Sequence, residues 1–196
     1  MKIIIVGENN YESNKYGSFP FYTKPDSTLI KGNKPFFIPD FTSECVFTTH
    51  LVARISRLGK SISQRFACRY YDAVTVGVNF TAKDVQEKMK AEGQPWTLAT
   101  DFDSSSVIGS FMQMNDVSIE KKVCRIEMNN EVIMKKELTD IGNIIEKGIA
   151  QLSTFFILRQ GDLLFSGPLH KPIKVDEGFH LSGFLDNYNL LEFNVK

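Results

Sequence analysis

Short apolar stretches recur along the chain, and clusters of turn-forming residues separate them. The stretches are rich in Phe and in β-branched residues, which favour strands. The turn-forming pairs between them are Gly17-Ser18, Pro25-Asp26, Gly32-Asn33, Pro39-Asp40 and Asn129-Asn130. This alternation predicts a β-rich domain of short strands, the first of them at the apolar run that ends at Gly7.

Two segments carry helical signals. Thr81 followed three residues later by Asp84 resembles a capping box and predicts a helix that Gly93 and Pro95 end. A second helix is predicted to begin near Asp140, because apolar residues then follow at helical spacing: Ile141, Ile144, Ile145, Ile149, Leu152 and Phe156.

Residues 46–55 (VFTTHLVARI) are predicted to form a strand whose two faces differ. Alternate residues of a strand share a face. One face is mostly apolar and is expected in the core: Phe47, Thr49, Leu51, Ala53 and Ile55. The other face begins polar and places Thr48 and His50 side by side: Val46, Thr48, His50, Val52 and Arg54.

Composition narrows the class of protein. The 196 residues fit one domain over 1–196. Within it, a weaker helical pattern covers residues 62–68, where a third helix is predicted. Acidic and basic residues balance at 23 each, so charge gives no indication of a nucleic-acid or membrane partner. The three cysteines are widely spaced and the first apolar run is too short for a signal sequence, so we expect reduced thiols and a cytoplasmic location.

Several blocks follow one another in a characteristic order over most of the chain. They are Lys24-Pro25-Asp26-Ser27, residues 35–41 (PFFIPDF), Arg57-Leu58-Gly59-Lys60, residues 77–86 (GVNFTAKDVQ), Pro95-Trp96, Phe102-Asp103, Gly109, Gly161-Asp162 and residues 190–196 (LLEFNVK). Together the blocks resemble the fumarylacetoacetate hydrolase family, including its small bacterial members. The resemblance implies a β-rich α+β fold of the family's C-terminal domain type. That fold is a mixed β-roll or barrel with a few flanking helices, and it is commonly dimeric.

The resemblance also implies a site for Mg²⁺, Mn²⁺ or Ca²⁺. In the family two carboxylates two residues apart on one strand, and a third from the glycine-aspartate block, hold a cation that polarises a keto acid. Here the two strand positions are Thr48 and His50, and the third is Asn79. Neutral hydroxyl, imidazole and amide groups make a poor hard-cation site, so we expect no metal and no cofactor.

Other family positions have changed as well. A proton-transfer histidine is replaced by Val46, a lysine by Thr100 and an arginine by Lys83, whereas Gln86 is retained and Ser104 stands where a threonine is usual. By a looser alignment, Ser13 and Asn10 replace a histidine and a tyrosine. The usual threonine-glycine-threonine-proline turn reads Ser166-Gly167-Pro168-Leu169, and the glycines after it become Lys171 and Ile173.

The candidate residues admit more than one interpretation. His50 is either a ligand or base, or a polar strand residue of a pocket that has lost its chemistry. Lys83 and Gln86, three apart on a helix, either bind a carboxylate or form a solvated face. Asp84 and Asp103 are more typical of a helix cap and a turn than of catalysis.

Further side chains close to these positions carry weaker signals. Glu44 and Asp101 are stray carboxylates near the site, and Cys45 is expected to be structural. His170 and His180 carry little signal.

Two hypotheses follow. The favoured one is a non-catalytic family member, with no catalytic or metal residue, that binds a small carboxylic acid or acts as a partner protein. It is expected to form a homodimer or to pair with an active paralogue through the family-like dimer surface. Its candidate pocket is lined by Val46, Thr48, His50, Asn79, Lys83, Gln86, Thr100 and Ser104. The alternative is a hydrolase, isomerase or decarboxylase acting on 2-oxo or acylpyruvate-type acids, either with the family's metal or with a metal-free site around His50, Lys83 and Gln86.

Overall fold

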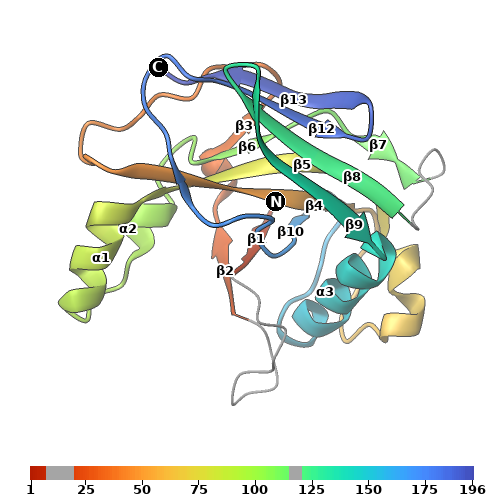
Figure 1. Ribbon diagram of the computed structural model, residues 1–196. Coiled ribbons are helices and arrows are strands. Elements are labelled where there is room, and N and C mark those ends of the chain that lie inside the picture. Colours follow the sequence, from red (N-terminus) through yellow and green to blue (C-terminus); the bar gives the residue numbers. More distant parts are fainter. Residues whose placement is uncertain (8–19, 115–120) are drawn as a thin grey trace.

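The computed structural model describes residues 1–7, 20–114 and 121–196 (Figure 1). The turn pair Gly17-Ser18 and the family positions Asn10 and Ser13 lie outside these residues. Within the described ranges, the strands form one sheet of nine strands and one of four.

The larger sheet has the order β2-β1-β10-β4-β5-β6-β3, with β11 paired to β4 and β7 paired to β5. Most neighbours are antiparallel, but β1–β10 and β3–β6 are parallel, so the sheet is mixed. Its strands are β1 (Ile3–Val6), β2 (Phe21–Lys24), β3 (Leu29–Lys31), β4 (Cys45–Ile55), β5 (Tyr71–Ala82), β6 (Ser106–Ile108), β7 (Met112–Gln113), β10 (Leu163–Phe165) and β11 (Ile173–Lys174).

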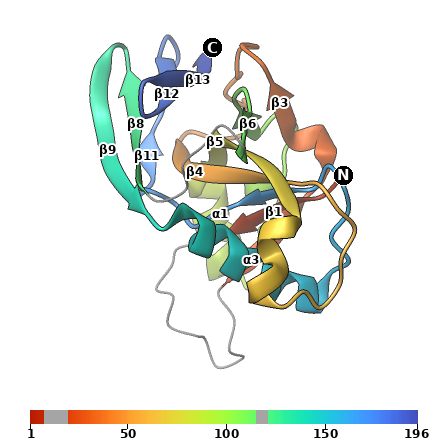
Figure 2. The ribbon, with the colours of Figure 1, turned by 90° about the vertical axis from the view of Figure 1, so that its right-hand side faces the viewer.

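The smaller sheet is antiparallel and covers one face of the larger sheet (Figure 2). Its order is β13-β12-β8-β9. Gly183 on β12 lies against Val76 of β5, where an added Cβ would come within 2.9 Å of the valine side chain. The strands are β8 (Lys121–Met128), β9 (Glu131–Thr139), β12 (His180–Leu185) and β13 (Tyr188–Asn194).

Helices flank the sheets: α1 (Lys83–Ala91), α2 (Thr97–Thr100), α3 (Ile141–Phe155) and the 3₁₀ helices η1 (Asp26–Thr28) and η2 (Gln64–Arg69). The prediction of α3 is confirmed. The Asp140 side chain accepts a hydrogen bond from the Asn143 backbone N–H at its start. Four residues of the apolar stripe are buried: Ile141, Ile145, Ile149 and Leu152. The weak helix predicted at residues 62–68 is the 3₁₀ helix η2, and α2 was not predicted.

The predicted capping box before α1 is wrong, although the helix itself is confirmed. Strand β5 continues through Thr81, which pairs with Val46 of β4, so Thr81 is not free to cap. The N-cap residue is Ala82, which makes no side-chain hydrogen bond. The Asp84 carboxylate instead accepts hydrogen bonds from the Thr42 and Ser43 side chains.

Strand β4 confirms the predicted strand and separates two apolar clusters. Its outer face, which carries Phe47, Leu51 and Ile55, packs with α3 and the smaller sheet. Its inner face, which carries Thr48, His50 and Val52, lies beside the cluster that contains Phe165 and Ile108.

The larger sheet is curled, because β2 contacts β5 across the inner face although three strands separate them in the sheet order. A sheet-rich structure with a curled half-barrel and few helices confirms the expected fold class. Among the described residues, none of the helices is both long and apolar enough to cross a membrane.

Candidate functional site

The pairing of β4 with β5 brings the three expected metal positions together. Thr48 lies directly opposite Asn79, and His50 lies opposite Gly77. Opposite residues of an antiparallel pair project from the same face, so Thr48, His50 and Asn79 share the inner face of the curled sheet. At Gly77 an added Cβ would come within 2.5 Å of the Val52 side chain, so packing on this face requires glycine.

His50 is buried and neutral near pH 7. Its Nδ1 lies 2.6 Å from the Ser166 carbonyl, which can only accept, so Nδ1 carries the hydrogen. Its Nε2 lies 2.9 Å from the Thr48 hydroxyl, which therefore donates to it. Burial lowers the pKa of His50 to about 4, although the Ser166 carbonyl opposes the shift. Both ring nitrogens are thus engaged with protein groups.

Asn79 joins two side chains of β2 that the sequence did not assign to the site, although Lys24 begins one of the family-like blocks. Its Oδ1 accepts a hydrogen bond from the Lys24 amine at 2.9 Å, and its Nδ2 donates to the Tyr22 hydroxyl at 2.9 Å. The Lys24 amine also donates to the Ser105 carbonyl at 3.2 Å. Tyr22 and Lys24 are two residues apart on a strand and so share a face. This spacing is the one local signal that could have identified them.

Lys24 is the basic group of this cluster. It is 2% exposed. Burial lowers the pKa of its amine to about 7, against the attraction of Asp101. Burial also raises the pKa of Tyr22, which therefore keeps its hydroxyl proton.

The donor set does not fit a divalent hard cation. The Thr48 hydroxyl is bonded to His50, and the Asn79 side-chain oxygen accepts a hydrogen bond from the Lys24 amine. No carboxylate stands at the three positions to offset the dehydration of Mg²⁺ or Ca²⁺. In the described part of the chain, no three His, Cys, Asp or Glu side chains lie close enough together to hold a metal ion.

Three other predicted site residues lie on different elements of the fold. Val46 is buried at the start of β4, on the same inner face as Thr48. Thr100 is buried at the end of α2, where its hydroxyl donates to Asp101 at 2.7 Å and its carbonyl accepts from Ser105. Ser104 occupies a turn with a φ of 66°.

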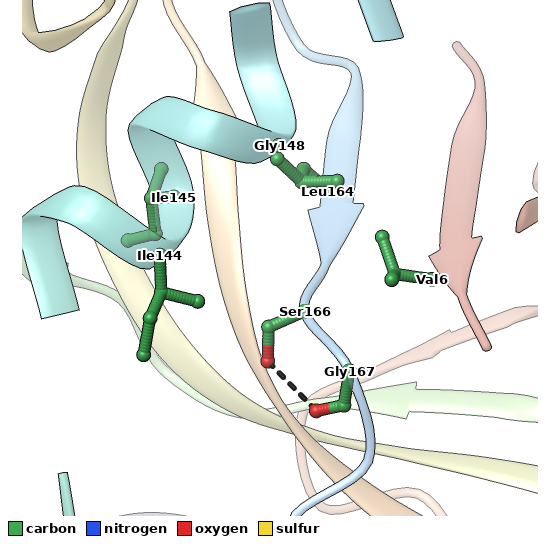
Figure 3. A pocket seen from close by; sticks show the side chains of 7 residues that line it. All are labelled: Val6, Ile144, Ile145, Gly148, Leu164, Ser166 and Gly167. Carbon is green, nitrogen blue, oxygen red and sulfur yellow. Dashed lines mark hydrogen bonds between the residues drawn. The ribbon is translucent and has the colours of Figure 1, made fainter. Parts of the chain in front are cut away.

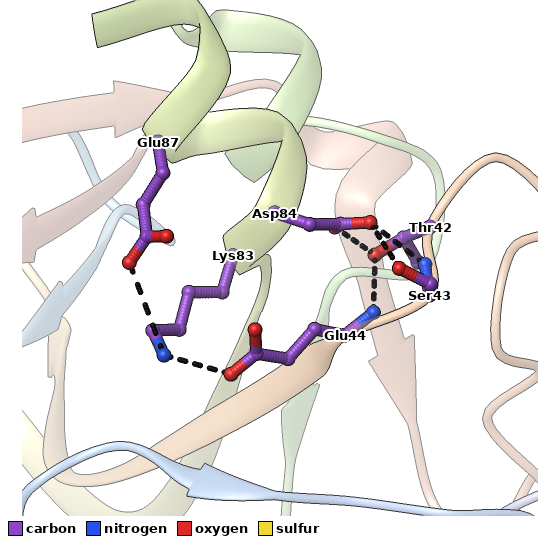
Figure 4. A network of polar contacts seen from close by, with 6 residues as sticks. All are labelled: Thr42, Ser43, Glu44, Lys83, Asp84 and Glu87. Carbon is purple, nitrogen blue, oxygen red and sulfur yellow. Dashed lines mark hydrogen bonds and ion pairs between the residues drawn. The ribbon is translucent and has the colours of Figure 1, made fainter. Parts of the chain in front are cut away.

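Lys83 belongs to a surface network at the start of α1 (Figure 4), and Gln86 lies on the same helix. The Lys83 amine pairs with Glu44 at 2.7 Å, and Gln86 accepts from Lys90 at 3.2 Å. The Asp84 carboxylate accepts hydrogen bonds from Thr42 at 2.5 Å and from Ser43 at 2.8 Å. Burial raises the pKa of Asp84, but these hydrogen bonds outweigh it and hold the pKa well below its usual range. None of these contacts reaches His50 or Asn79.

An apolar pocket lies on the other side of the larger sheet, between α3 and β10 (Figure 3). It is lined by Val6, Ile144, Ile145, Gly148, Leu164, Ser166 and Gly167. Ser166 belongs to the turn expected from the family pattern, and its carbonyl is the one that holds His50. The turn therefore links the pocket to the inner face.

Comparisons with known proteins agree over most of the chain. A family model described as "Fumarylacetoacetate (FAA) hydrolase C-terminal" matches residues 6–180. A fumarylpyruvate hydrolase of Ralstonia sp is 26% identical over 147 residues, which are 75% of this chain and 77% of that protein. A mitochondrial oxaloacetate tautomerase of Caenorhabditis elegans is 28% identical, with 100% of this chain and 94% of that protein covered.

Solved structures share the fold. The crystal structure of fumarylpyruvate hydrolase from Pseudomonas aeruginosa, in complex with Mn²⁺ and pyruvate, has a TM-score of 0.86 at 24% identity and covers 100% of this chain and 89% of its own. The crystal structure of 2-hydroxyhepta-2,4-diene-1,7-dioate isomerase from Mycobacterium marinum has a TM-score of 0.82 at 25% identity. It covers 99% of this chain and 73% of its own.

Proposed function

The chain belongs to the fumarylacetoacetate hydrolase family, and from that membership we propose that it is a non-catalytic member that binds a small carboxylic acid without a divalent cation. One observation carries the proposal. The three positions at which the family pattern expects metal carboxylates converge on the inner face, yet they hold Thr48, His50 and Asn79, whose polar atoms bond to other protein groups. The loss of three carboxylates removes the main attraction for a hard cation.

The names of relatives favour a second candidate. A fumarylpyruvate hydrolase and an oxaloacetate tautomerase are among the curated relatives, which favours an enzyme acting on acylpyruvate-type or 2-oxo acids. A metal-free version of that enzyme would depend on His50, Lys83 and Gln86. Both nitrogens of His50 are engaged, and Lys83 is paired with Glu44 at the surface, so these contacts favour the non-catalytic proposal.

The proposal extends to partners and location. We expect a cytoplasmic protein that forms a homodimer or pairs with an active paralogue. Measuring the molecular mass of the purified protein in solution, alone and mixed with such a paralogue, tests the expected association separately.

Thermal melting tests the absence of a cation site. A ligand that binds only the folded state raises the melting temperature in proportion to RT ln(1 + [L]/Kd). The wild type is expected to melt at the same temperature with and without millimolar Mn²⁺ or Mg²⁺ and to leave fumarylpyruvate and oxaloacetate unchanged. A rise with either cation, or turnover of either acid, would overturn the proposal.

A variant with restored carboxylates is the matched control. Thr48→Glu, His50→Glu and Asn79→Asp together place three carboxylates on the inner face, so this variant should melt higher in Mn²⁺. If it folds and still ignores Mn²⁺, the three positions are not those of the family's metal site.

A further inference from the structure

A separate cavity opens at the end of the inner face where β4 finishes. Its volume of about 420 Å³ lies within the range of small-molecule binding sites in proteins. Side chains of four strands and of the segment after β6 line it, and the lining combines two cations with apolar groups. The side chains that matter are Lys31, Arg54, Ile108, Phe111 and Leu163.

The cavity is separate from the expected metal positions. Arg54 follows His50 by four residues on β4, so the two share a face and lie about 13 Å apart along the strand. Val52 lies between them on that face, and Phe165 of β10 lies opposite Val52. Both of these side chains are 0% exposed, so an apolar layer closes the space between the two ends of the inner face.

Arg54 is the positioned cation of this cavity. Apolar Leu163 and Ala73 lie opposite it in the neighbouring strands. Its Nε donates to the Asp72 carboxylate at 2.8 Å, and its guanidinium carbon lies 5.0 Å from the centroid of the Phe111 ring. These contacts hold the guanidinium in place, and its two terminal nitrogens donate no hydrogen bond to the described residues. Four N–H donors of a fixed cation are therefore available to an anion.

The charge of the lining is positive. Lys31 lies beside Ile108 in the β3–β6 pair and is exposed, and within the described ranges it forms no ion pair. None of the described residues that line the cavity is acidic. Asp72 offsets one of the two positive charges, but its side chain is 43% exposed, so solvent weakens the pairing. This balance favours an anionic ligand over a neutral or cationic one.

The walls of the cavity are mainly apolar. Ile108 and Leu163 are 3% and 2% exposed and belong to the inner apolar cluster, against which Phe111 packs. Gly109 and Gly161 also line the cavity, and because they lack side chains they leave flat stretches of backbone in the wall. Apolar walls favour a ligand with a hydrophobic body, and flat walls favour a planar one. A short acid such as pyruvate offers no such body.

We infer that this cavity binds a hydrophobic organic acid with a planar body. The carboxylate pairs with the two terminal nitrogens of Arg54, a geometry in which guanidinium and carboxylate form two parallel hydrogen bonds. The apolar body lies against Ile108, Phe111 and Leu163, and Lys31 attracts the acid from its exposed position. None of these residues belongs to the candidate pocket around His50, so the inference goes beyond the proposed function and does not depend on it.

Calorimetric titration of 2-naphthoate into the full-length protein tests the inference. The wild type is expected to bind it, and to bind the uncharged 2-naphthamide at least about 10-fold more weakly, because hydrogen bonds between charged groups are the stronger ones. Excess pyruvate should not displace 2-naphthoate, since pyruvate lacks the apolar body. Wild-type protein that does not bind 2-naphthoate, that binds both naphthalene probes equally, or that releases 2-naphthoate to pyruvate would overturn the inference.

Two variants locate the site. Arg54→Met should weaken 2-naphthoate binding by about 10-fold to 100-fold, because it removes the charged donors. Ser110→Trp, at another lining residue, keeps Arg54 and fills the cavity with an indole ring, so it should abolish binding and decides the matter if Arg54→Met fails to fold.

Arg65→Met is the matched control. Arg65 also lies over a phenylalanine ring, 4.5 Å from the Phe66 centroid, but outside the cavity, so this variant should bind 2-naphthoate as the wild type does. Unchanged binding in Arg54→Met or Ser110→Trp, or an equal loss in Arg65→Met, would contradict the inference.

Discussion

The two faces of β4 are similarly buried but chemically different. On the outer face, Phe47 and Leu51 pack with α3 and the smaller sheet, and contacts between apolar groups stabilise them. On the inner face, His50 is 2% exposed and is held by two hydrogen bonds. The comparison teaches that two of the expected metal positions, His50 and Asn79, are about as buried as the core. Burial disfavours the charged form of a titratable group there unless a charge partner is supplied.

The largest expected effect lies on the outer face. Phe47 is 0% exposed and contacts the Phe80 ring at a centroid distance of 6.3 Å. Phe47→Ala removes this ring from the core and should cost about 3–5 kcal/mol of unfolding free energy. Urea denaturation measures it. Phe41→Ala, at a ring that is 45% exposed, should cost much less; equal losses would mean that the outer face is not the core.

The next effect belongs to Lys24 on the inner side and depends on pH. Its pKa is about 7 in the folded protein, below 10.5 in the unfolded chain, so the unfolded chain binds more protons between these values. Wild-type stability should therefore rise as pH increases from 7 to 10, by up to about 4 kcal/mol from this group. Urea denaturation over that range should give a flatter profile for Lys24→Met. If the wild type and Lys24→Met gave parallel profiles of stability against pH, burial would not lower the pKa of the Lys24 amine.

A smaller effect of the same sign is expected from His50 at lower pH. Its pKa is about 4 in the folded protein and 6.5 in the unfolded chain, so stability falls as pH decreases from 6.5 to 4, by up to about 3 kcal/mol. His50→Gln should lose this dependence. Thr48→Val removes the hydrogen bond but not the titrating ring, so it should retain the dependence. If Thr48→Val lost the pH dependence and His50→Gln retained it, the assignment of this dependence to the His50 ring would be wrong.

The smallest effect is expected at the surface network of α1. The Lys83–Glu44 pair is half-exposed, and such pairs contribute little because solvent and salt screen them. Lys83→Ala should therefore leave the melting temperature nearly unchanged, and Gln86→Ala likewise. If either variant abolished the binding of a small carboxylic acid, these residues would belong to the candidate pocket after all, as the sequence alone allowed.

The sequence predicted the parts of the fold that have a local period. The alternation in residues 46–55 gave β4 and its two faces, and the apolar stripe gave α3. Helix α2 has four residues and shows no period, and the capping box at Thr81 failed because β5 continues through it. These misses arise where tertiary pairing overrides a local pattern.

The candidate site was predicted only in part. The resemblance identified Thr48, His50 and Asn79, and the β4–β5 register brings them together. Lys24 and Tyr22 were missed because they reach Asn79 only when the sheet curls and brings β2 to β5. Such a contact is set by the curvature of the whole sheet, so neither the family-like block that begins at Lys24 nor the face that Tyr22 and Lys24 share could reveal it.

Calorimetric titration of Mn²⁺ into the wild type and into the Thr48→Glu, His50→Glu, Asn79→Asp variant tests the central claim most directly. We predict no binding heat from the wild type up to millimolar Mn²⁺. The variant should bind with a dissociation constant on the order of 10⁻⁴ M or tighter, because it regains three carboxylate ligands. Saturable Mn²⁺ binding by the wild type would contradict the account.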